Sequence, residues 1–282
     1  MDTLPDRRTE VRGELCQLLD ARGAFDIVEA ALLIAAEEYP ELDVEREARR
    51  IRLIAAEGAR RAFNLSNPFA RLDVLRAFLH DELGFGGNEN EYNDPRNSYL
   101  NEVLDRRLGN PLSLSIIFIE VARAAGFEAR GVGLPGHFVA RVSLDGRTLL
   151  IDPYNGCHVI SEDDCRQLVS RTTGRSSLFR RNLLKGTDER AMLTRMLLNL
   201  KYIHVKNEDY PRALAAVERL LLVSPDDSTE IRDRGFLHAH LGRPGAAVSD
   251  LESYLALTPG ARDADSVRGR VAWLRQRISE YN

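Results

Sequence analysis

Two polar residues, His137 and Asp152, are spaced so that they could meet and do acid–base chemistry. Each lies in a predicted strand, and Asp145-Gly146 between the strands is a strong signal for a tight hairpin turn. Because side chains alternate along a strand, the hairpin can set Asp152 beside His137 on one face. In such a pair the carboxylate holds the imidazole in one tautomer and stabilises its charged form. A histidine in a strand is also commonly a hydrogen-bonded structural group, so both interpretations stay open.

The elements that must position this pair are two strands and the helix before them. Pro111 suits the first turn of a helix, and Gly126 suits the left-handed position just past its end. The residues between them are apolar on nearly every side, which is typical of a helix buried by other elements. The strands follow directly, over residues 131–142 and 147–153. We therefore expect a buried helix and then an antiparallel hairpin that carries the two polar residues.

This order of buried helix, strand with histidine and strand with aspartate resembles the core of the transglutaminase-like superfamily, which includes papain-like cysteine enzymes. The resemblance is closer to one bacterial branch, the SirB-type proteins, which join a transglutaminase-like domain to tetratricopeptide repeats. It implies an α+β fold that is mostly helical, with a papain-like core, a small antiparallel sheet and a following α-helical repeat domain. It covers roughly residues 24–260 and depends on five motifs: Phe85-Gly86-Gly87-Asn88, Asp94 to Leu100, Arg107 to Ser115, Pro135-Gly136-His137-Phe138, and Asp152 to Gly156.

The resemblance also implies a cysteine nucleophile at the start of the buried helix, and here that position is Pro111. Proline has no nucleophilic atom. Ser113 is the nearest hydroxyl, but at 3.6 residues per turn it leaves the helix roughly 200° round from Pro111, which favours a first-turn residue bonded to backbone. Cys157 follows Asp152 closely, but the strand end would have to curl back to bring its thiol to His137. The predicted catalytic site is therefore a vestigial one, formed by His137, Asp152, Pro111 and Ser113.

Polar residues on two loops are candidate binding residues around that site. The segment 86–97 is dense in residues that form turns through their own side chains, and we expect it near the start of the buried helix. Asp94 and Asn97 stand where a helix begins, so helix capping is the alternative, and favoured, interpretation for both. The predicted binding residues are Asn88, Asp94, Asn97 and Asn155.

Composition and charge argue against several other classes of protein. The 39 basic and 43 acidic residues are mixed along the chain, with no basic block to follow a phosphate backbone, so we expect no nucleic-acid partner. No apolar run reaches the roughly 20 residues of a membrane span, and the first residues lack the order of a signal peptide. Three cysteines without metal-ligand spacing predict reduced thiols, no metal site and no cofactor, in a cytoplasmic protein.

The C-terminal part of the sequence repeats itself. Residues 210–225 align with residues 244–259, with Ala213 on Ala247, at an interval of 34 residues. This is the period of tetratricopeptide repeats, in which each helix pair buries its apolar face by stacking on a neighbour. Two copies fall short of the usual three, so we expect the last helix, over residues 267–278, to act as a cap.

From these features we predict a transglutaminase-like domain with an N-terminal helical hairpin over residues 1–175 and a tetratricopeptide-repeat domain over residues 176–282. The predicted function is that of a non-catalytic module, a pseudoenzyme, for protein interaction or regulation. Its partner would be a protein or peptide, because helical repeats commonly hold such partners. The alternative is an amide hydrolase or acyl transferase with a relocated nucleophile. The sequence leaves the oligomeric state open.

Overall fold

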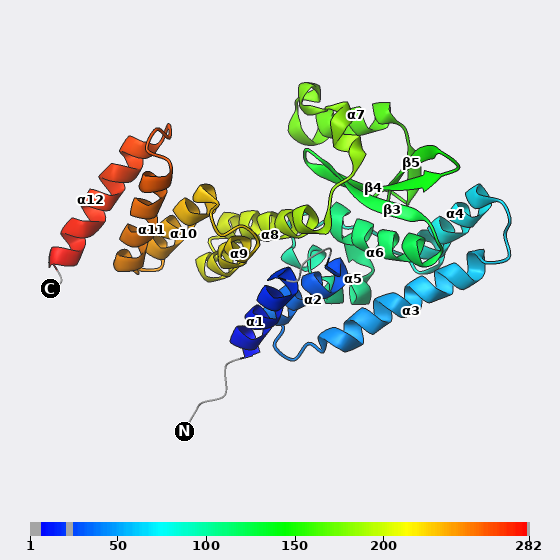
Figure 1. Cartoon of the computed structure of the whole chain (residues 1–282), viewed down its shortest axis with the longest axis horizontal. Helices are drawn as coiled ribbons and strands as arrows, with labels where there is room; N and C mark the ends of the chain where they lie inside the picture. Colours follow the sequence, from blue (N-terminus) through cyan, green and yellow to red (C-terminus); the bar gives the residue numbers. More distant parts are fainter. Residues whose placement is uncertain (1–6, 21–24, 281–282) are drawn as a thin grey trace. The chain divides into compact units, whose positions relative to one another are not determined.

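The computed structural model describes residues 7–20 and 25–280, and its mostly helical α+β fold confirms the predicted class (Figure 1). The chain divides into two compact units, Met1–Met196 and Leu197–Asn282. The first unit includes residues 176–196, which the sequence analysis assigned to the repeat domain. Which segment folds by itself therefore stays a prediction. The opening residues 1–6, on which the signal-peptide expectation rests, lie outside the described residues.

The first unit is built largely from helices and helical turns. The side-chain oxygen of Asp43 accepts from the Arg46 N–H and so caps α3, as predicted. The predicted helix over residues 68–83 is shorter as an α-helix and continues as a π-helical turn that keeps Phe78 and Leu79 buried. The helices are α1 (Arg7–Asp20), α2 (Ile27–Glu38), α3 (Val44–Ala62), α4 (Pro68–Ala77), α5 (Leu100–Arg106), α6 (Pro111–Ala124) and α7 (Glu162–Thr173), with turns η1 (Phe78–Glu82), η2 (Pro95–Asn97), η3 (Ser176–Leu178) and η4 (Arg181–Lys185).

The sheet of the first unit is antiparallel and ordered as in the chain. Its strands are β3 (Glu128–Leu134), β4 (His137–Leu144), β5 (Arg147–Asp152) and β6 (His158–Ile160). Asp145 and Gly146 form the turn between β4 and β5 with φ angles of 47° and 75°, which confirms the predicted hairpin. A separate, parallel pair joins β1 (Gly86–Gly87) to β2 (Leu108–Gly109), directly before α6.

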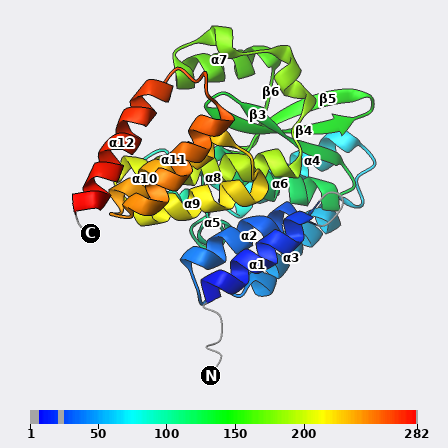
Figure 2. The ribbon, with the colours of Figure 1, turned by 60° about the vertical axis from the view of Figure 1, so that its left-hand side comes forward.

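Helix α6 lies at the centre of the first unit. Its apolar side chains are buried on all sides, as predicted, and burial of a side chain such as Phe118 contributes about 1.5–3 kcal/mol. Figure 1 shows α6 along one face of the sheet and α7 on the opposite face, and Figure 2 shows α6 between the sheet and helices α2 and α3. Val139 and Leu150 pack in one cluster with Cys165 of α7. His137 shares the strand face of Val139 and therefore lies on the α7 side.

The second unit is an array of antiparallel helices. Ala213 and Ala247, the small residues that align in the repeat, are both fully buried. Glu208 and Gly242, which also lie 34 residues apart, have φ angles of 56° and 69°, so both helix pairs turn through the same backbone conformation. The helices are α9 (Tyr210–Val223), α10 (Ser228–His240), α11 (Pro244–Leu257) and α12 (Ala264–Glu280), and α8 (Glu189–Lys206) spans the boundary between the units.

Candidate functional site

The first turn of α6, where the family resemblance places a nucleophile, is closed by its own cap. Asn110 Oδ1 accepts from the N–H groups of Leu112 and Ser113, at 3.0 and 2.9 Å. Ser113 Oγ accepts in return from the Asn110 N–H at 3.0 Å, which completes a capping box. Pro111 occupies the first helical position, where its missing N–H leaves no bond unmade. The amides that usually activate a group at a helix start are therefore already bonded.

Ser113 is a cap rather than an exposed hydroxyl. Its Oγ lies 2.7 Å from the Asn97 carbonyl oxygen and 3.1 Å from that of Asn110, and the side chain is fully buried. The structure thus agrees with the interpretation of Ser113 as a first-turn residue bonded to backbone.

His137 and Asp152 lie together at the ends of β4 and β5. Their Nε2 and Oδ2 atoms are 2.9 Å apart, and both side chains are buried. The same Oδ2 accepts from Asn155 Nδ2 at 2.7 Å, while Oδ1 accepts from the N–H groups of Tyr154 and Asn155. Asp152 is held by the turn that follows β5, because that turn bends its amides back onto the carboxylate.

The carboxylate of Asp152 is held in its charged form. Burial is the largest influence on its pKa and raises it, but the hydrogen bond and charge of His137 and the bonds from Asn155 leave the pKa below its usual value. A charged carboxylate only accepts hydrogen bonds, so the proton between the two groups belongs to His137 Nε2. This network assigns the tautomer in which Nδ1 is the unprotonated nitrogen. Nδ1 makes no hydrogen bond to any residue within the described ranges.

Tyr154 connects this pair to the segment before α6. Its ring meets the His137 ring edge-on at 5.9 Å and the Tyr92 ring at 6.1 Å. Its carbonyl oxygen accepts from the Gly87 N–H at 3.1 Å, and a Cβ at Gly87 would lie only 2.5 Å from the ring. Burial, together with the nearby Tyr92, Glu89 and Asp152, raises the pKa of Tyr154 to about 12, so the phenol is neutral at ordinary pH.

The predicted binding residues on the first loop use their polar atoms within that loop. Asn88 Nδ2 donates to Asn97 Oδ1 at 3.0 Å, and Asn97 Nδ2 donates to the Glu91 carbonyl oxygen at 2.8 Å. Asp94 caps η2 by accepting from the Arg96 N–H at 2.9 Å. Asn97, in contrast, is a buried link between the loop and α6 rather than a cap. Asn155, on the second loop, bonds to Asp152, and binding roles for all four residues stay predictions.

The three thiols differ in burial, and none is activated by its surroundings in a way that the structure shows. Burial, as the largest influence, raises the pKa of Cys157 to about 12, because the nearby Asp152 and Asp81 add to it while Arg76 opposes it. Burial also raises the pKa of Cys165, on α7, to about 12. Cys16 on α1 is half-buried and unpaired. A thiol with a raised pKa is a poor nucleophile at neutral pH.

Arg195 was not identified from the sequence, yet it contacts His137 directly. Its Nη2 donates to the His137 carbonyl oxygen at 3.1 Å, and its guanidinium lies 5.8 Å from the centre of the Phe138 ring. Burial lowers the pKa of Arg195, and Tyr92 opposes this effect. Arg195 belongs to α8, 58 residues beyond the histidine, so no local pattern could have indicated the contact.

Two further searches concern metals and membranes. Across residues 7–20 and 25–280, no three histidine, cysteine, aspartate or glutamate side chains gather as a metal site would require. Within those same ranges, no helix combines the length and apolar character needed to cross a bilayer.

Comparison with known families identifies both parts of the chain. Residues 45–198 match the model of the transglutaminase-like superfamily, which covers more than half of the sequence. The chain belongs to the transglutaminase-like superfamily. Residues 200–272 of this superfamily member match the tetratricopeptide repeat, which confirms the repeat predicted from the 34-residue interval.

The relatives of this transglutaminase-like protein are bacterial and share both parts. A UPF0162 protein of Xylella fastidiosa is 36% identical over 259 residues, which cover 90% of this chain and 92% of the relative. A UPF0162 protein of Vibrio cholerae is 27% identical over 88% of this chain and 92% of its own length. Protein SirB1 of Salmonella typhimurium is 27% identical over 83% and 86%. These matches confirm the SirB-type combination of domains. No solved structure matches the chain significantly.

Proposed function

We propose that this protein is a non-catalytic interaction module, in which the transglutaminase-like domain is a pseudoenzyme and the repeat unit holds a segment of a partner protein. The observation that carries the proposal is the first turn of α6. There Pro111 stands at the expected nucleophile position, and Asn110 and Ser113 have already bonded the free amides. The acid–base pair of His137 and Asp152 then lacks a nucleophile on that helix to activate.

The thiols outside α6 give the same support. A relocated nucleophile would need a lowered pKa, and the pKa of Cys157, the thiol nearest to Asp152 in the sequence, is instead raised to about 12 by burial. Its backbone is also fixed in the left-handed region at a φ of 54°, with its carbonyl oxygen accepting from Arg76.

The repeat unit offers an exposed apolar stripe for a partner. Leu198, Tyr202 and Val205 are 41%, 61% and 43% exposed and lie on one face of α8, at spacings of four and three residues. At the matching positions of the next two repeat helices stand Phe236 and Trp273, and Trp273 is also 42% exposed. Exposed aromatic and aliphatic side chains in a row are typical of a surface that another protein covers.

The proposal extends to the setting of the protein. We place it in the cytoplasm, because sparse, unpaired cysteines fit a reducing compartment. The partner is a protein or peptide rather than nucleic acid, because acidic and basic residues are mixed along the whole chain.

Restoring the missing group tests the pseudoenzyme assignment. Pro111→Cys would place a thiol at a helix N-terminus, where the helix dipole favours thiolate. We expect that thiol to react with iodoacetamide at neutral pH about tenfold or more faster than Cys16, and to lose the advantage when His137→Ala is added. Wild type should show only slow alkylation, at Cys16 first, and no thiol-dependent amide hydrolysis or acyl transfer. An ordinary thiol in Pro111→Cys would show that Pro111 is not the nucleophile position.

The second candidate function is amide hydrolysis or acyl transfer with a relocated nucleophile. It is favoured by one observation, that the His137–Asp152 pair is intact and leaves Nδ1 unbonded within the described residues. Wild-type turnover that survives Pro111→Ala but disappears in His137→Ala would establish this enzyme and remove the pseudoenzyme assignment.

The stripe on α8 has its own test. We expect Tyr202→Asp to abolish capture of the partner that immobilised wild-type protein retains from cell extract. Leu257→Asp, which changes another exposed apolar side chain at the end of α11, should leave that capture intact. Equal capture by Tyr202→Asp and wild type would show that the stripe is not the binding surface.

A further inference from the structure

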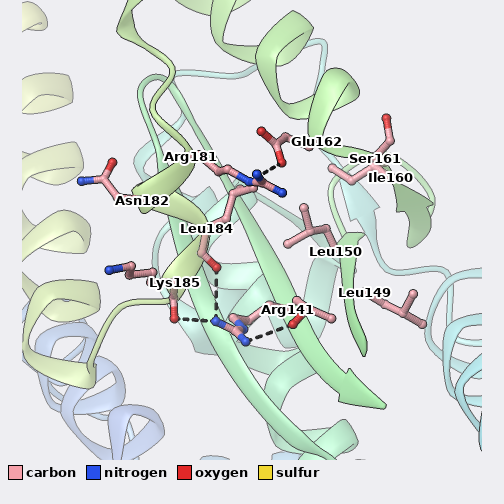
Figure 3. A pocket seen from close by; sticks show the side chains of 11 residues that line it. Arg141, Leu149, Leu150, Ile160, Ser161, Glu162, Arg181, Asn182, Leu184 and Lys185 are labelled. Atoms are coloured by element: carbon pink, nitrogen blue, oxygen red, sulfur yellow. Dashed lines mark hydrogen bonds and ion pairs between the residues drawn. The ribbon is translucent and has the colours of Figure 1, made fainter. Parts of the chain in front are cut away.

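A pocket of about 620 Å³ opens on the first unit, on the sheet face that α7 and η4 flank (Figure 3). Arg141 of β4 and Arg181 of η4 line it from two sides, and Leu150, Ile160 and Leu184 supply apolar surface between them. Its volume lies in the range of sites that bind small ligands or peptide side chains.

Arg141 is a fixed positive charge without a carboxylate partner. Its Nη1 donates to the carbonyl oxygens of Leu184 and Lys185, at 3.3 and 2.6 Å, and its Nη2 donates to Thr148 Oγ1 at 3.1 Å. These acceptors hold the guanidinium in place but leave its charge uncompensated. Among the described residues, no carboxylate comes within ion-pair distance of it.

Arg181 supplies a second, mobile-ended charge over the pocket. Its Nε lies 3.1 Å from Glu162 Oε2, and its side chain is 85% exposed. Figure 3 shows this guanidinium reaching toward Glu162 and Leu150, whereas the side chain of Lys185 points away from the pocket. An exposed pair of this kind contributes little to stability, so Arg181 can exchange Glu162 for another carboxylate at small cost.

We propose that this pocket binds an acidic peptide segment, with a carboxylate between Arg141 and Arg181 and a neighbouring aliphatic side chain on Leu150, Ile160 and Leu184. The outer strand of the described sheet, β6, ends in the pocket, so an extended segment can lie beside it. A phosphate group fits less well. The Glu162 carboxylate would repel a dianion, and Ser161 Oγ already accepts from the Asp164 N–H at the start of α7.

This pocket is separate from both the His137 cluster and the stripe on α8, so its test does not depend on the pseudoenzyme assignment. The probe is a short fluorescent peptide in which Glu alternates with Leu, followed by fluorescence anisotropy with the full-length protein. A peptide with Gln in place of Glu is the neutral control, and we expect it to bind at least about tenfold more weakly. Added salt should weaken binding of the acidic peptide.

Three variants locate the binding in the pocket. Arg181→Glu should weaken the acidic peptide about tenfold, while Lys185→Glu, the same charge change on a side chain that points away, should weaken it by no more than about twofold. Glu162→Gln should strengthen it by about threefold, because it removes the carboxylate that competes for Arg181. A misfolded variant cannot produce such a gain.

The contrary results are equally definite. Equal binding of the Glu and Gln peptides, equal effects of Arg181→Glu and Lys185→Glu, or weaker binding in Glu162→Gln would each overturn the proposal. Displacement of the peptide by inorganic phosphate, at concentrations where chloride of the same ionic strength has no effect, would assign the pocket to phosphate instead.

Discussion

Asp152 accepts hydrogen bonds from His137 and Asn155 on one oxygen and from two backbone amides on the other. At the scale of single residues this is the most constrained group of the first unit, because each lone pair in use fixes a different neighbour. The arrangement has two consequences: it holds the imidazole in a defined tautomer, and it ties the end of β5 to the turn after it. Both consequences hold for a pseudoenzyme as well as for an enzyme.

Replacing that carboxylate should therefore cost stability in a pH-dependent way. We expect Asp152→Asn to lower the free energy of unfolding by about 1–3 kcal/mol at neutral pH. The folded-state pKa of Asp152 lies below the unfolded value of about 3.9, so the stabilisation is present above that pH and is lost as the pH falls through the folded-state value. Urea titrations of wild type and variant across the acidic range measure the difference.

The control for this prediction is Asp163→Asn on α7, whose side chain is largely exposed. It should change stability by no more than about 0.5 kcal/mol at any pH. A deficit in Asp152→Asn that stayed constant down to strongly acidic pH would show that the charge of Asp152 contributes nothing.

At the scale of elements, the short pair β1–β2 does more than its length suggests. It carries Gly87, whose lack of a side chain lets the ring of Tyr154 pack directly on the backbone. Because Tyr154 also touches His137 and Tyr92, this contact brings three segments together: the strand before α6, the loop after β1 and the turn after β5.

A methyl group at that contact should displace the ring. A Cβ at Gly87 would lie 2.5 Å from the Tyr154 ring, so we expect Gly87→Ala to destabilise the fold by about 1–3 kcal/mol and to shift the ring signals of Tyr154 and His137 in NMR spectra. The matched change is Gly86→Ala, where the nearest atom is 4.0 Å away. If both variants behave like wild type, the ring does not pack against Gly87.

The repeat helices give a second prediction at this scale. Ala247 of α11 is fully buried in the cluster formed with α12, so a larger side chain must push the helices apart. We expect Ala247→Leu to cost about 1–3 kcal/mol, measured by thermal or urea unfolding. Ala246→Leu, one residue earlier and exposed, is the control and should melt like wild type. An unchanged melting temperature in Ala247→Leu would contradict the repeat packing.

At the scale of the whole molecule, the border between the two units runs through α8. The N-terminal half of this helix serves the first unit: Thr187, just before it, bridges to Gly131, and Met192 and Arg195 pack near Gly131 and the His137 backbone. The C-terminal half carries the exposed stripe of the repeat unit.

Truncation tests where the first unit ends. A fragment of residues 1–206 keeps α8 and should melt at a clearly higher temperature than a fragment of residues 1–175, which loses buried side chains such as Met192 and Leu193. Circular dichroism of the two purified fragments measures this. Equal melting temperatures would instead support the domain boundary at residue 175 that the sequence analysis predicted.

Features that depend on neighbouring residues could be predicted from the sequence. The buried helix α6, the Asp43 cap, the β4–β5 hairpin and the 34-residue repeat each follow from a short pattern of side chains. The meeting of His137 and Asp152 belongs with them, because a tight turn sets the register of its two strands. The replacement of a nucleophile by Pro111 is likewise legible in one dimension.

Contacts between distant segments could not be predicted in this way. Arg195 reaches His137 across 58 residues, Gly87 accommodates the ring of Tyr154, and Arg141 meets the carbonyl groups of Leu184 and Lys185. Asn97 likewise proved to be a buried link to α6 instead of a cap. Each depends on how whole elements pack, and periodicity records only which face of an element is apolar, not which partner covers it.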